Sequence, residues 1–254
     1  MLLWLDTFTE RFAPEIAVDA IRVLEDAGFD VEVSGSGRCC ALTWISTGQL
    51  GAARRILRRT VDDLAEHARR GMVIVGLEPS CTAVLRSDAL ELLGEEDAAA
   101  RDVAAATRTL AEQLASARPD WSPPSLAGAQ VVAQPHCHHH AVLGWAADEI
   151  LLRAAGATVT RLGGCCGLAG NFGVERGHHE VSVAVAETEL LPAVRAAPDG
   201  AVVLADGFSC RTQLDQLSER HGLHLAQLLA SRLGDHPPLA DGAEPGSTEV
   251  TGPG

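Results

Sequence analysis

The chain contains neither lysine nor tyrosine, and aromatic residues make up only 4% of it. Without lysine, the Gly-Lys-Ser/Thr phosphate loop of many nucleotide-binding proteins cannot form. No Gly-x-Gly-x-x-Gly follows an expected strand, and no Gly-x-Ser-x-Gly occurs. The sequence therefore indicates neither a dinucleotide fingerprint nor a serine-hydrolase elbow, and we expect no flavin site in this chain.

Positive charge and long apolar runs are also scarce. Twenty arginines against 34 acidic residues leave a formal net charge of −14, which argues against a nucleic-acid partner because phosphate binding needs a basic surface. No apolar run approaches the roughly 18 residues of a membrane helix, so we expect no transmembrane segment. The start lacks the basic region of a secretory signal. We expect a cytoplasmic protein, either free or peripheral to the membrane through its partners.

The seven cysteines form two matching sets. Each set contains an adjacent pair, and a single cysteine follows each pair at a similar distance. In a reducing cytoplasm such cysteines are metal ligands or redox groups rather than disulfides, and an odd number also fits disulfides poorly. The sets are Cys39, Cys40 and Cys81, and then Cys137, Cys165, Cys166 and Cys210.

The hydrophobic pattern predicts an α/β protein made of two similar β-α-β-α-β-α repeats with parallel sheets. We expect the first repeat over 1–117, with a connecting helix at about 96–116, and the second over 118–233. A Pro-, Gly- and acid-rich tail at 234–254 is expected to be disordered. Expected strands lie at 2–5, 29–33 and 72–77 in the first repeat, and at 130–133, 157–162 and 201–205 in the second.

The cysteines fall in the loops that follow these strands. Loops at the carboxyl ends of parallel strands share one edge of the sheet, where α/β folds bind ligands. The cysteines of each set should therefore converge at that edge. When the repeats are aligned, Thr7 of the first takes the position of Cys137 in the second.

Four thiolates are the usual ligand number of a structural zinc ion or an iron–sulfur cluster. The second repeat supplies four cysteine thiolates and the first repeat supplies three. Three thiolates could hold a labile cluster, hold a metal with an open position, or join a cluster between the repeats. The alternative is that some are buried structural thiols. Glycines around both pairs suit the sharp turn that lets adjacent cysteines serve one site.

Three further residues are candidates for the surroundings of a metal. His136 and His138 flank Cys137 and could ligate it, tune a cluster or move protons; the alternative is a solvated helix start. Arg211 follows Cys210 and could offset the charge of a thiolate-rich centre or contact an anionic substrate. A plain surface arginine is equally consistent with the sequence.

Three motifs identify a resemblance. They are Pro-His-Cys-His, Gly-Gly-Cys-Cys-Gly-Leu-Ala-Gly-Asn-Phe-Gly and Ala-Asp-Gly-Phe-Ser-Cys-Arg. Over about residues 3–230 the chain resembles the cysteine-rich CCG-domain family, to which a heterodisulfide reductase subunit belongs. It is most similar to the C-terminal region of FAD-linked D-2-hydroxyacid dehydrogenases with iron–sulfur clusters.

The resemblance implies an iron–sulfur cluster of the 4Fe-4S type, or alternatively zinc. It implies an electron-transfer module or subunit of a flavin-linked oxidoreductase acting on a D-2-hydroxy acid of the lactate, glycolate or 2-hydroxyglutarate type. Its partners would be an FAD-linked oxidase subunit and a ferredoxin-like iron–sulfur protein. The implied ligands are Cys137, Cys165, Cys166 and Cys210, followed in the first repeat by Cys39, Cys40 and Cys81.

Two other functions stay open. One is a zinc-stabilised, non-redox scaffold or binding module of such an enzyme, and the other is a heterodisulfide reductase-like thiol/disulfide protein. The full family pattern ends each repeat in Cys-x-x-Cys, and Ala41 replaces the glycine after the first pair. These departures argue against a double noncubane site. The positions flanking the last cysteines are Glu78, Val84, Gly207 and Gln213.

Overall fold

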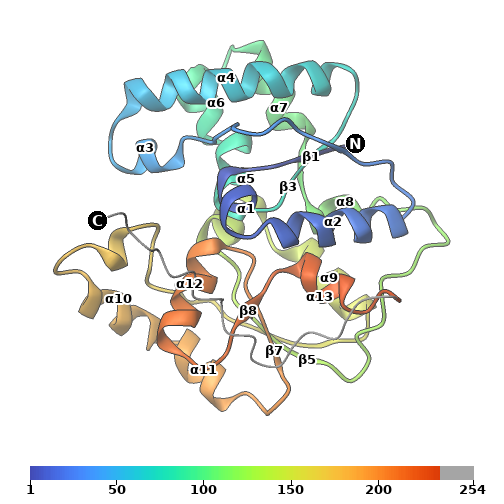
Figure 1. The fold of residues 1–254 in the computed structure, drawn as a ribbon, viewed down its shortest axis with the longest axis vertical. Coiled ribbons are helices and arrows are strands. Elements are labelled where there is room, and N and C mark those ends of the chain that lie inside the picture. Colours follow the sequence, from blue (N-terminus) through green and yellow to red (C-terminus); the bar gives the residue numbers. More distant parts are fainter. Residues whose placement is uncertain (235–254) are drawn as a thin grey trace, which may run out of the picture.

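The computed structural model describes residues 1–234, and within them the chain forms two four-stranded parallel sheets (Figure 1). This confirms the predicted α/β class with repeated βαβ units. The first sheet has the order β2-β1-β3-β4 and the second the order β6-β5-β7-β8. The strands are β1 Leu2–Trp4, β2 Glu32–Val33, β3 Ile74–Gly76, β4 Thr107–Thr109, β5 Gln130–Ala133, β6 Thr158–Arg161, β7 Val202–Leu204 and β8 Gly222–Leu223.

Each sheet contains one strand more than the three that we expected per repeat. The fourth strand of the first sheet, β4, interrupts the predicted helix over 96–116, so that prediction is wrong. Thr107 and Thr109 are β-branched and lie beside β3, where they complete the edge of the sheet. The identical strand order shows that the two halves of the chain share one plan.

Eight helices accompany the first sheet. Residues 79–93 form two helices that meet at Ser87, and the first of them begins at Pro79, a favourable first helical residue. The helices are α1 Thr7–Phe12, α2 Pro14–Asp26, α3 Leu42–Ser46, α4 Leu50–Arg69, α5 Pro79–Arg86, α6 Asp88–Leu93, α7 Ala98–Ala106 and α8 Leu110–Leu114.

The second sheet has its own set of helical elements. The helical segment over 179–196 divides at residues 187–189. Pro192 does not break it, because it lies within the first turn of α11, where a missing N–H is tolerated. The elements are the π-helical turn η1 His139–Leu143, α9 Ala146–Ala154, the 3₁₀ turn η2 Phe172–Val174, α10 His179–Ala186, α11 Leu190–Ala196, α12 Phe208–Leu217 and α13 Leu225–Ala230.

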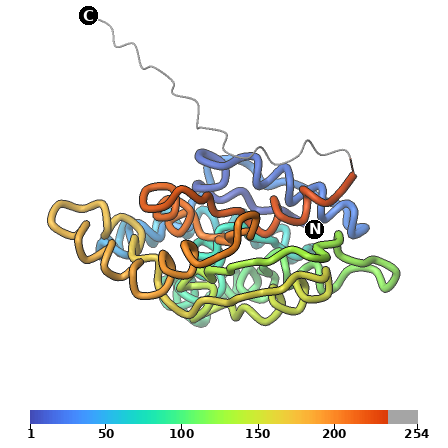
Figure 2. The backbone as a smooth tube through the Cα atoms, turned by 90° about the horizontal axis from the view of Figure 1, so that it is seen from below, coloured from blue at the N-terminus to red at the C-terminus, as the bar shows by residue number. Residues whose placement is uncertain are grey.

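A shared apolar core joins the two sheets. It draws buried residues from α2, α8, α9 and α13 and from strands of both sheets. Figure 2 shows α2 and α13 side by side, although they lie at opposite ends of the described chain. Two further clusters cover the outer faces, and they include Cys40 and Cys81 in one and Cys166 and Cys210 in the other. The shared core fixes the position of one cysteine set relative to the other.

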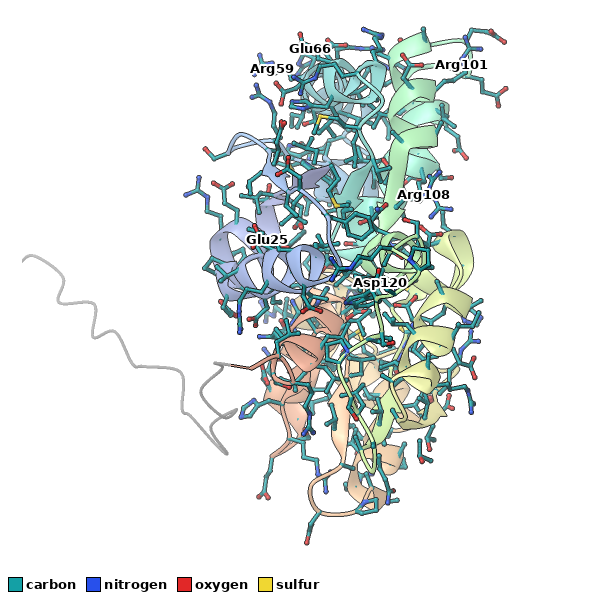
Figure 3. The ribbon with its side chains drawn as sticks, turned by 90° about the vertical axis from the view of Figure 1, so that its right-hand side faces the viewer. Glu25, Arg59, Glu66, Arg101, Arg108 and Asp120 are labelled. Carbon is teal, nitrogen blue, oxygen red and sulfur yellow. The ribbon has the colours of Figure 1, made fainter. Side chains whose placement is uncertain are left out.

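Charged side chains cover the outside. Figure 3 shows Arg59 and Glu66 projecting from α4, and Arg101 from α7. None of the helices among residues 1–234 is long and apolar enough to cross a membrane. The tail predicted over 234–254 lies, after Gly234, outside the described residues.

Candidate functional site

The first cysteine set converges at the carboxyl ends of β2 and β3. Cys39 and Cys40 lie in the loop before α3, and Cys81 lies in the first turn of α5. The sulfurs of Cys40 and Cys81 are 2.9 Å apart, and both residues are buried. Cys39 is only partly buried, and its sulfur interacts with Cys40 and with the side chain of Thr7.

The second set converges in the same way at the carboxyl ends of β5, β6 and β7. The thiol of Cys166 interacts with Cys165 and also with Cys210, which lies in the first turn of α12. Cys137 follows β5 and is close enough to Cys165 to influence its charge. Cys166 and Cys210 are buried, Cys165 is partly exposed and Cys137 is exposed. All four cysteines therefore lie at one edge of the second sheet. Cys166 contacts both Cys165 and Cys210, whereas the exposed Cys137 is linked to them only through the electrostatic effect of Cys165.

The two sites share a common arrangement. The Thr7 side chain hydrogen-bonds to Cys39, whereas Cys137 interacts with Cys165 only electrostatically. A backbone N–H also points at the leading sulfur of each pair: Ala41 donates to Cys39 Sγ, and Gly167 donates to Cys165 Sγ, each at 3.3 Å. Such N–H donors stabilise negative charge on sulfur.

Both donors occupy left-handed backbone positions, which make the sharp turn after each pair. The φ angle is +67° at Ala41 and +89° at Gly167. A Cβ atom at residue 167 would lie 2.2 Å from the carbonyl oxygen of Ser182 in α10, so glycine is required there by space as well as by conformation. Ala41 adopts the same turn at a conformational cost.

Burial and crowding raise the pKa of six of the thiols, those of Cys39, Cys40, Cys81, Cys137, Cys165 and Cys166. Burial raises the pKa of Cys81 to about 12. The pKa of Cys166 is also raised to about 12, because a hydrogen bond with Cys165 that lowers it is outweighed by contact with Cys210 and by burial. Crowded thiolates repel one another and are poorly solvated, so they ionise together only around a cation. A set of three or four such sulfurs therefore fits a metal ion or cluster.

His136 lies beneath the second site. It is buried, its Nδ1 accepts the N–H of His138 at 3.2 Å, and its Nε2 is 3.3 Å from Ser209 Oγ. Burial lowers its pKa to about 3, so the ring is neutral. Cys137 Sγ is 3.9 Å from His136 Nδ1, and the rings of His136 and His138 are 5.3 Å apart at their centres. Both histidines thus border the cysteine site.

Arg211 contacts backbone carbonyl groups rather than the cysteine sulfurs. Its Nη1 donates to the backbone carbonyl oxygens of Ala205 and Asp206. The guanidinium therefore holds the turn between β7 and α12, and it makes no hydrogen bond to a sulfur among the described residues.

Glu78 is a functional candidate that the sequence interpretation noted only as a departure from the family pattern. It is 3% exposed, and its Oε2 accepts the N–H of Phe208 at 2.8 Å, from the other repeat. Its Oε1 accepts the hydroxyl of Ser80 at 2.8 Å. One carboxylate thus caps α5 beside Cys81 and the first turn of α12 beside Cys210. The side chains of Ser80 and Ser209 do not cap these helices.

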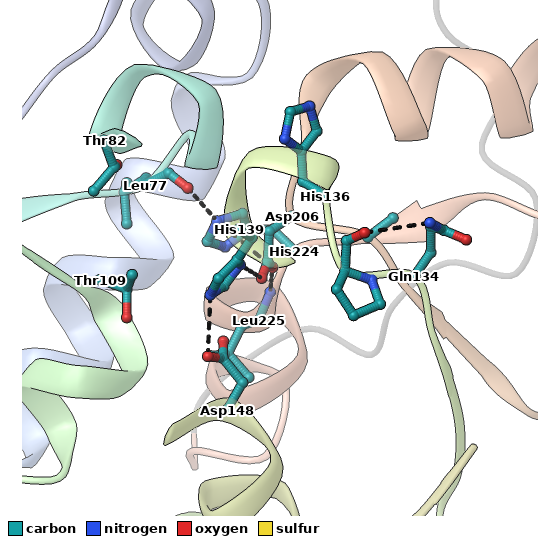
Figure 4. A network of polar contacts seen from close by, with 12 residues as sticks. Leu77, Thr82, Thr109, Gln134, His136, His139, Asp148, Asp206, His224 and Leu225 are labelled. Carbon is teal, nitrogen blue, oxygen red and sulfur yellow. Dashed lines mark hydrogen bonds and ion pairs between the residues drawn. The ribbon is translucent and has the colours of Figure 1, made fainter. Parts of the chain in front are cut away.

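A buried polar network lies where the two sheets meet (Figure 4). His224 Nε2 donates to the carbonyl oxygen of Leu77 at 3.1 Å and so links the repeats. Asp206 Oδ1 accepts the N–H of Leu225 at 2.7 Å. His139 lies between Asp148 and Asp206. The sequence analysis singled out His136 and His138 but not His139, and so missed this network.

Comparison with known proteins agrees with this class of site. Residues 6–86 match the family model "CCG: Cysteine-rich domain". The predicted resemblance to cysteine-rich CCG domains is thereby confirmed. The match covers the first cysteine set, and the second sheet repeats the same strand order with a fuller set of thiols.

Two curated relatives match nearly the whole chain. D-2-hydroxyglutarate dehydrogenase of Escherichia coli (strain K12) is 28% identical over 233 residues, which is 88% of this chain and 22% of that protein. One subunit of the anaerobic glycerol-3-phosphate dehydrogenase of the same organism is 26% identical over 225 residues, which is 87% of this chain and 56% of that subunit. The chain thus spans about a fifth of one relative and just over half of the other.

The close packing at Gly167 yields a stability prediction. Gly167→Ala should destabilise the protein by more than about 2 kcal/mol, because the methyl group meets the Ser182 carbonyl at an unfavourable φ. Gly170→Ala is the control: its φ is +70° but nothing lies within 4 Å, so only about 1 kcal/mol is expected. Urea unfolding measures both, and equal losses would contradict the assignment.

The hydrogen bonds of Glu78 to both repeats yield a second stability prediction. Glu78→Ala removes the acceptor of three donors, the N–H and hydroxyl of Ser80 and the N–H of Phe208, so we expect a loss of about 2–4 kcal/mol in the free energy of unfolding. Glu78→Gln can still accept from Phe208 and donate to Ser80, and should lose less than half as much. Chemical denaturation compares the two variants; similar losses would show that the charge, not the hydrogen bonds, matters.

Proposed function

We propose that this chain is an iron–sulfur electron-transfer module or subunit of a flavin-linked oxidoreductase that acts on a D-2-hydroxy acid. The observation that carries the proposal is the gathering of Cys137, Cys165, Cys166 and Cys210 at one sheet edge. Four thiolates with backbone N–H donors aimed at them are the ligand set of an iron–sulfur cluster.

The relatives support a role in electron transfer rather than in substrate recognition. Their names specify two different substrates, D-2-hydroxyglutarate and glycerol 3-phosphate, yet both are dehydrogenases and both contain a region similar to this chain. A region shared by dehydrogenases of different substrates serves best at a step that they have in common. Removal of electrons after substrate oxidation is such a step.

Residues of this chain have distinct roles in the proposal. The four cysteines of the second repeat would hold a cluster of the 4Fe-4S type, which when bound accepts and releases one electron at a time. The N–H of Gly167 would stabilise negative charge on Cys165, and the buried, neutral ring of His136 would border the site without adding charge. The exposed side, at Cys137, is where a partner's redox centre would approach.

The first repeat supplies the second part of the proposal. Cys39, Cys40 and Cys81 form a three-thiol site in which Thr7 takes the fourth position. Three thiolates would hold a cluster or metal with one position open to exchange. In this proposal residues 1–117 and 118–233 are two domains, each with one site.

The remaining components follow from the length of the relatives. Because this chain covers only part of each, we propose that an FAD-linked oxidase subunit and a ferredoxin-like iron–sulfur protein complete the enzyme. The assembly would work in the cytoplasm, with any contact to the membrane made by the partners.

Zinc is the main alternative, since four thiolates also suit a structural zinc site. It would make the chain a non-redox scaffold. Thiol–disulfide exchange is less well supported. The sulfurs of Cys40 and Cys81 lie close together in space, but both residues are buried and their thiols have raised pKa values. Thiol–disulfide exchange requires an accessible thiolate.

Anaerobic purification tests the proposal. The protein should contain iron and acid-labile sulfide in equal amounts, with the broad visible absorbance of thiolate–iron charge transfer. Cys210→Ser should abolish the cluster of the second repeat, whereas Cys81→Ser, which lies at the matching position of the first, should leave that cluster intact. A colourless protein with stoichiometric zinc would refute the redox function, and circular dichroism checks that each variant is folded.

Completing the first site offers an independent test. Thr7→Cys adds a fourth sulfur beside Cys39, so the metal content per chain should rise and the first-repeat centre should resist chelators for longer. Thr43→Cys is the matched control, because it adds an exposed thiol in α3, whereas Thr7 hydrogen-bonds to Cys39. If both variants bind equal amounts of metal, Thr7 does not occupy a ligand position.

A further inference from the structure

A second, cysteine-free group of metal-ligating side chains lies buried between the two sheets. It consists of His139 from η1, Asp148 from α9 and Asp206 from the end of β7 (Figure 4). One ligand atom from each lies within 4.8 Å of the other two. His139 Nε2 is 3.2 Å from Asp148 Oδ2, and His139 Nδ1 is 4.0 Å from Asp206 Oδ2. The three residues are 2%, 1% and 7% exposed.

The polar atoms of this group lack conventional partners. Both ring nitrogens of His139 and Oδ2 of Asp148 are buried and have no hydrogen bond of good geometry to any described residue. Buried polar atoms are nearly always satisfied, yet His139 Nε2 and Asp148 Oδ2 have only their mutual 3.2 Å contact and His139 Nδ1 has only Asp206 at 4.0 Å, so the group has room for a further partner. A cavity of about 10 Å³ lies against the group, and Thr82 and Thr109 of the first repeat line its other side. That volume suits one small occupant.

The charge of the group indicates what the occupant is. Two buried carboxylates lie beside two imidazoles, His139 and His224, and His224 Nε2 is 3.7 Å from Asp206 Oδ1. The neighbouring cation, Arg211, donates hydrogen bonds to the backbone carbonyl oxygens of Ala205 and Asp206. His224 Nε2 donates a hydrogen bond to the carbonyl oxygen of Leu77. Without a metal ion the charge of the two carboxylates is compensated only in part, because burial disfavours the charged form of His139, although Asp148 and Asp206 raise its pKa. A divalent cation would neutralise both.

We propose that His139, Asp148 and Asp206 together bind one divalent first-row transition-metal ion at the junction of the two sheets. One imidazole nitrogen and two carboxylate oxygens suit Mn²⁺, Fe²⁺ or Zn²⁺ and differ from the all-sulfur sites at the sheet edges. The ion ties η1, α9 and the end of β7 together against the first repeat. It therefore stabilises the junction and takes no part in electron transfer. The site is independent of the proposed function, since no cysteine contributes to it.

Mn²⁺ is the probe of choice, because it prefers oxygen and nitrogen ligands to thiolates and is paramagnetic. The full chain should bind one Mn²⁺ per molecule in an equilibrium titration followed by electron paramagnetic resonance, and its thermal midpoint should rise with Mn²⁺. His139→Gln and Asp148→Asn should each weaken binding at least about tenfold. The matched controls are His221→Gln and Asp215→Asn, an exposed histidine–aspartate pair that should leave binding unchanged.

A measurement on the wild-type protein keeps the test decisive if a buried variant fails to fold. Pulsed electron paramagnetic resonance of bound Mn²⁺ should show coupling to an imidazole nitrogen, as expected for His139. No Mn²⁺ binding, binding without nitrogen coupling, or binding that survives both His139→Gln and Asp148→Asn would each overturn the proposal. Because iron and sulfide content are not involved, these results do not depend on whether the cysteine sites hold clusters.

Discussion

The crowding of sulfur atoms at the carboxyl ends of parallel strands is the constraint on which the rest of this structure depends. In each repeat a cysteine pair and a cysteine from the first turn of a helix meet in a largely buried place, where the thiols resist ionisation. Such an arrangement is costly unless a cation compensates the charge. The left-handed turns at Ala41 and Gly167 bring the two sulfurs of each pair to one side and aim an N–H at the leading one. These features make sense together as a binding site for a metal or cluster.

The two sites are placed relative to one another by contacts between the repeats. The core around α2, α8, α9 and α13 joins both sheets, and Glu78 bridges the helix that carries Cys81 and the helix that carries Cys210. His224 adds a second link through Leu77. A change at one cysteine loop is therefore mechanically connected to the other, which suits a module in which two centres keep a fixed separation.

The repeated βαβ plan and the convergence of the cysteines could be predicted from sequence because both depend on local signals: short apolar strands, helix periodicity and the spacing of Cys39-Cys40 and Cys165-Cys166. The fourth strands could not, because β4 is a three-residue segment whose pairing with β3 decides its conformation. Glu78 was missed as a cap because its partner Phe208 is 130 positions away. The His139 group was missed for the same reason: its members come from three elements that only the fold brings together.

X-ray absorption spectroscopy of the metal in the anaerobically purified full chain tests the central claim most directly. The account predicts an iron edge, a shell of sulfur neighbours, and a second shell of iron from a cluster. An absorption edge from zinc alone, with four sulfurs at about 2.3 Å and no metal neighbour, would contradict it.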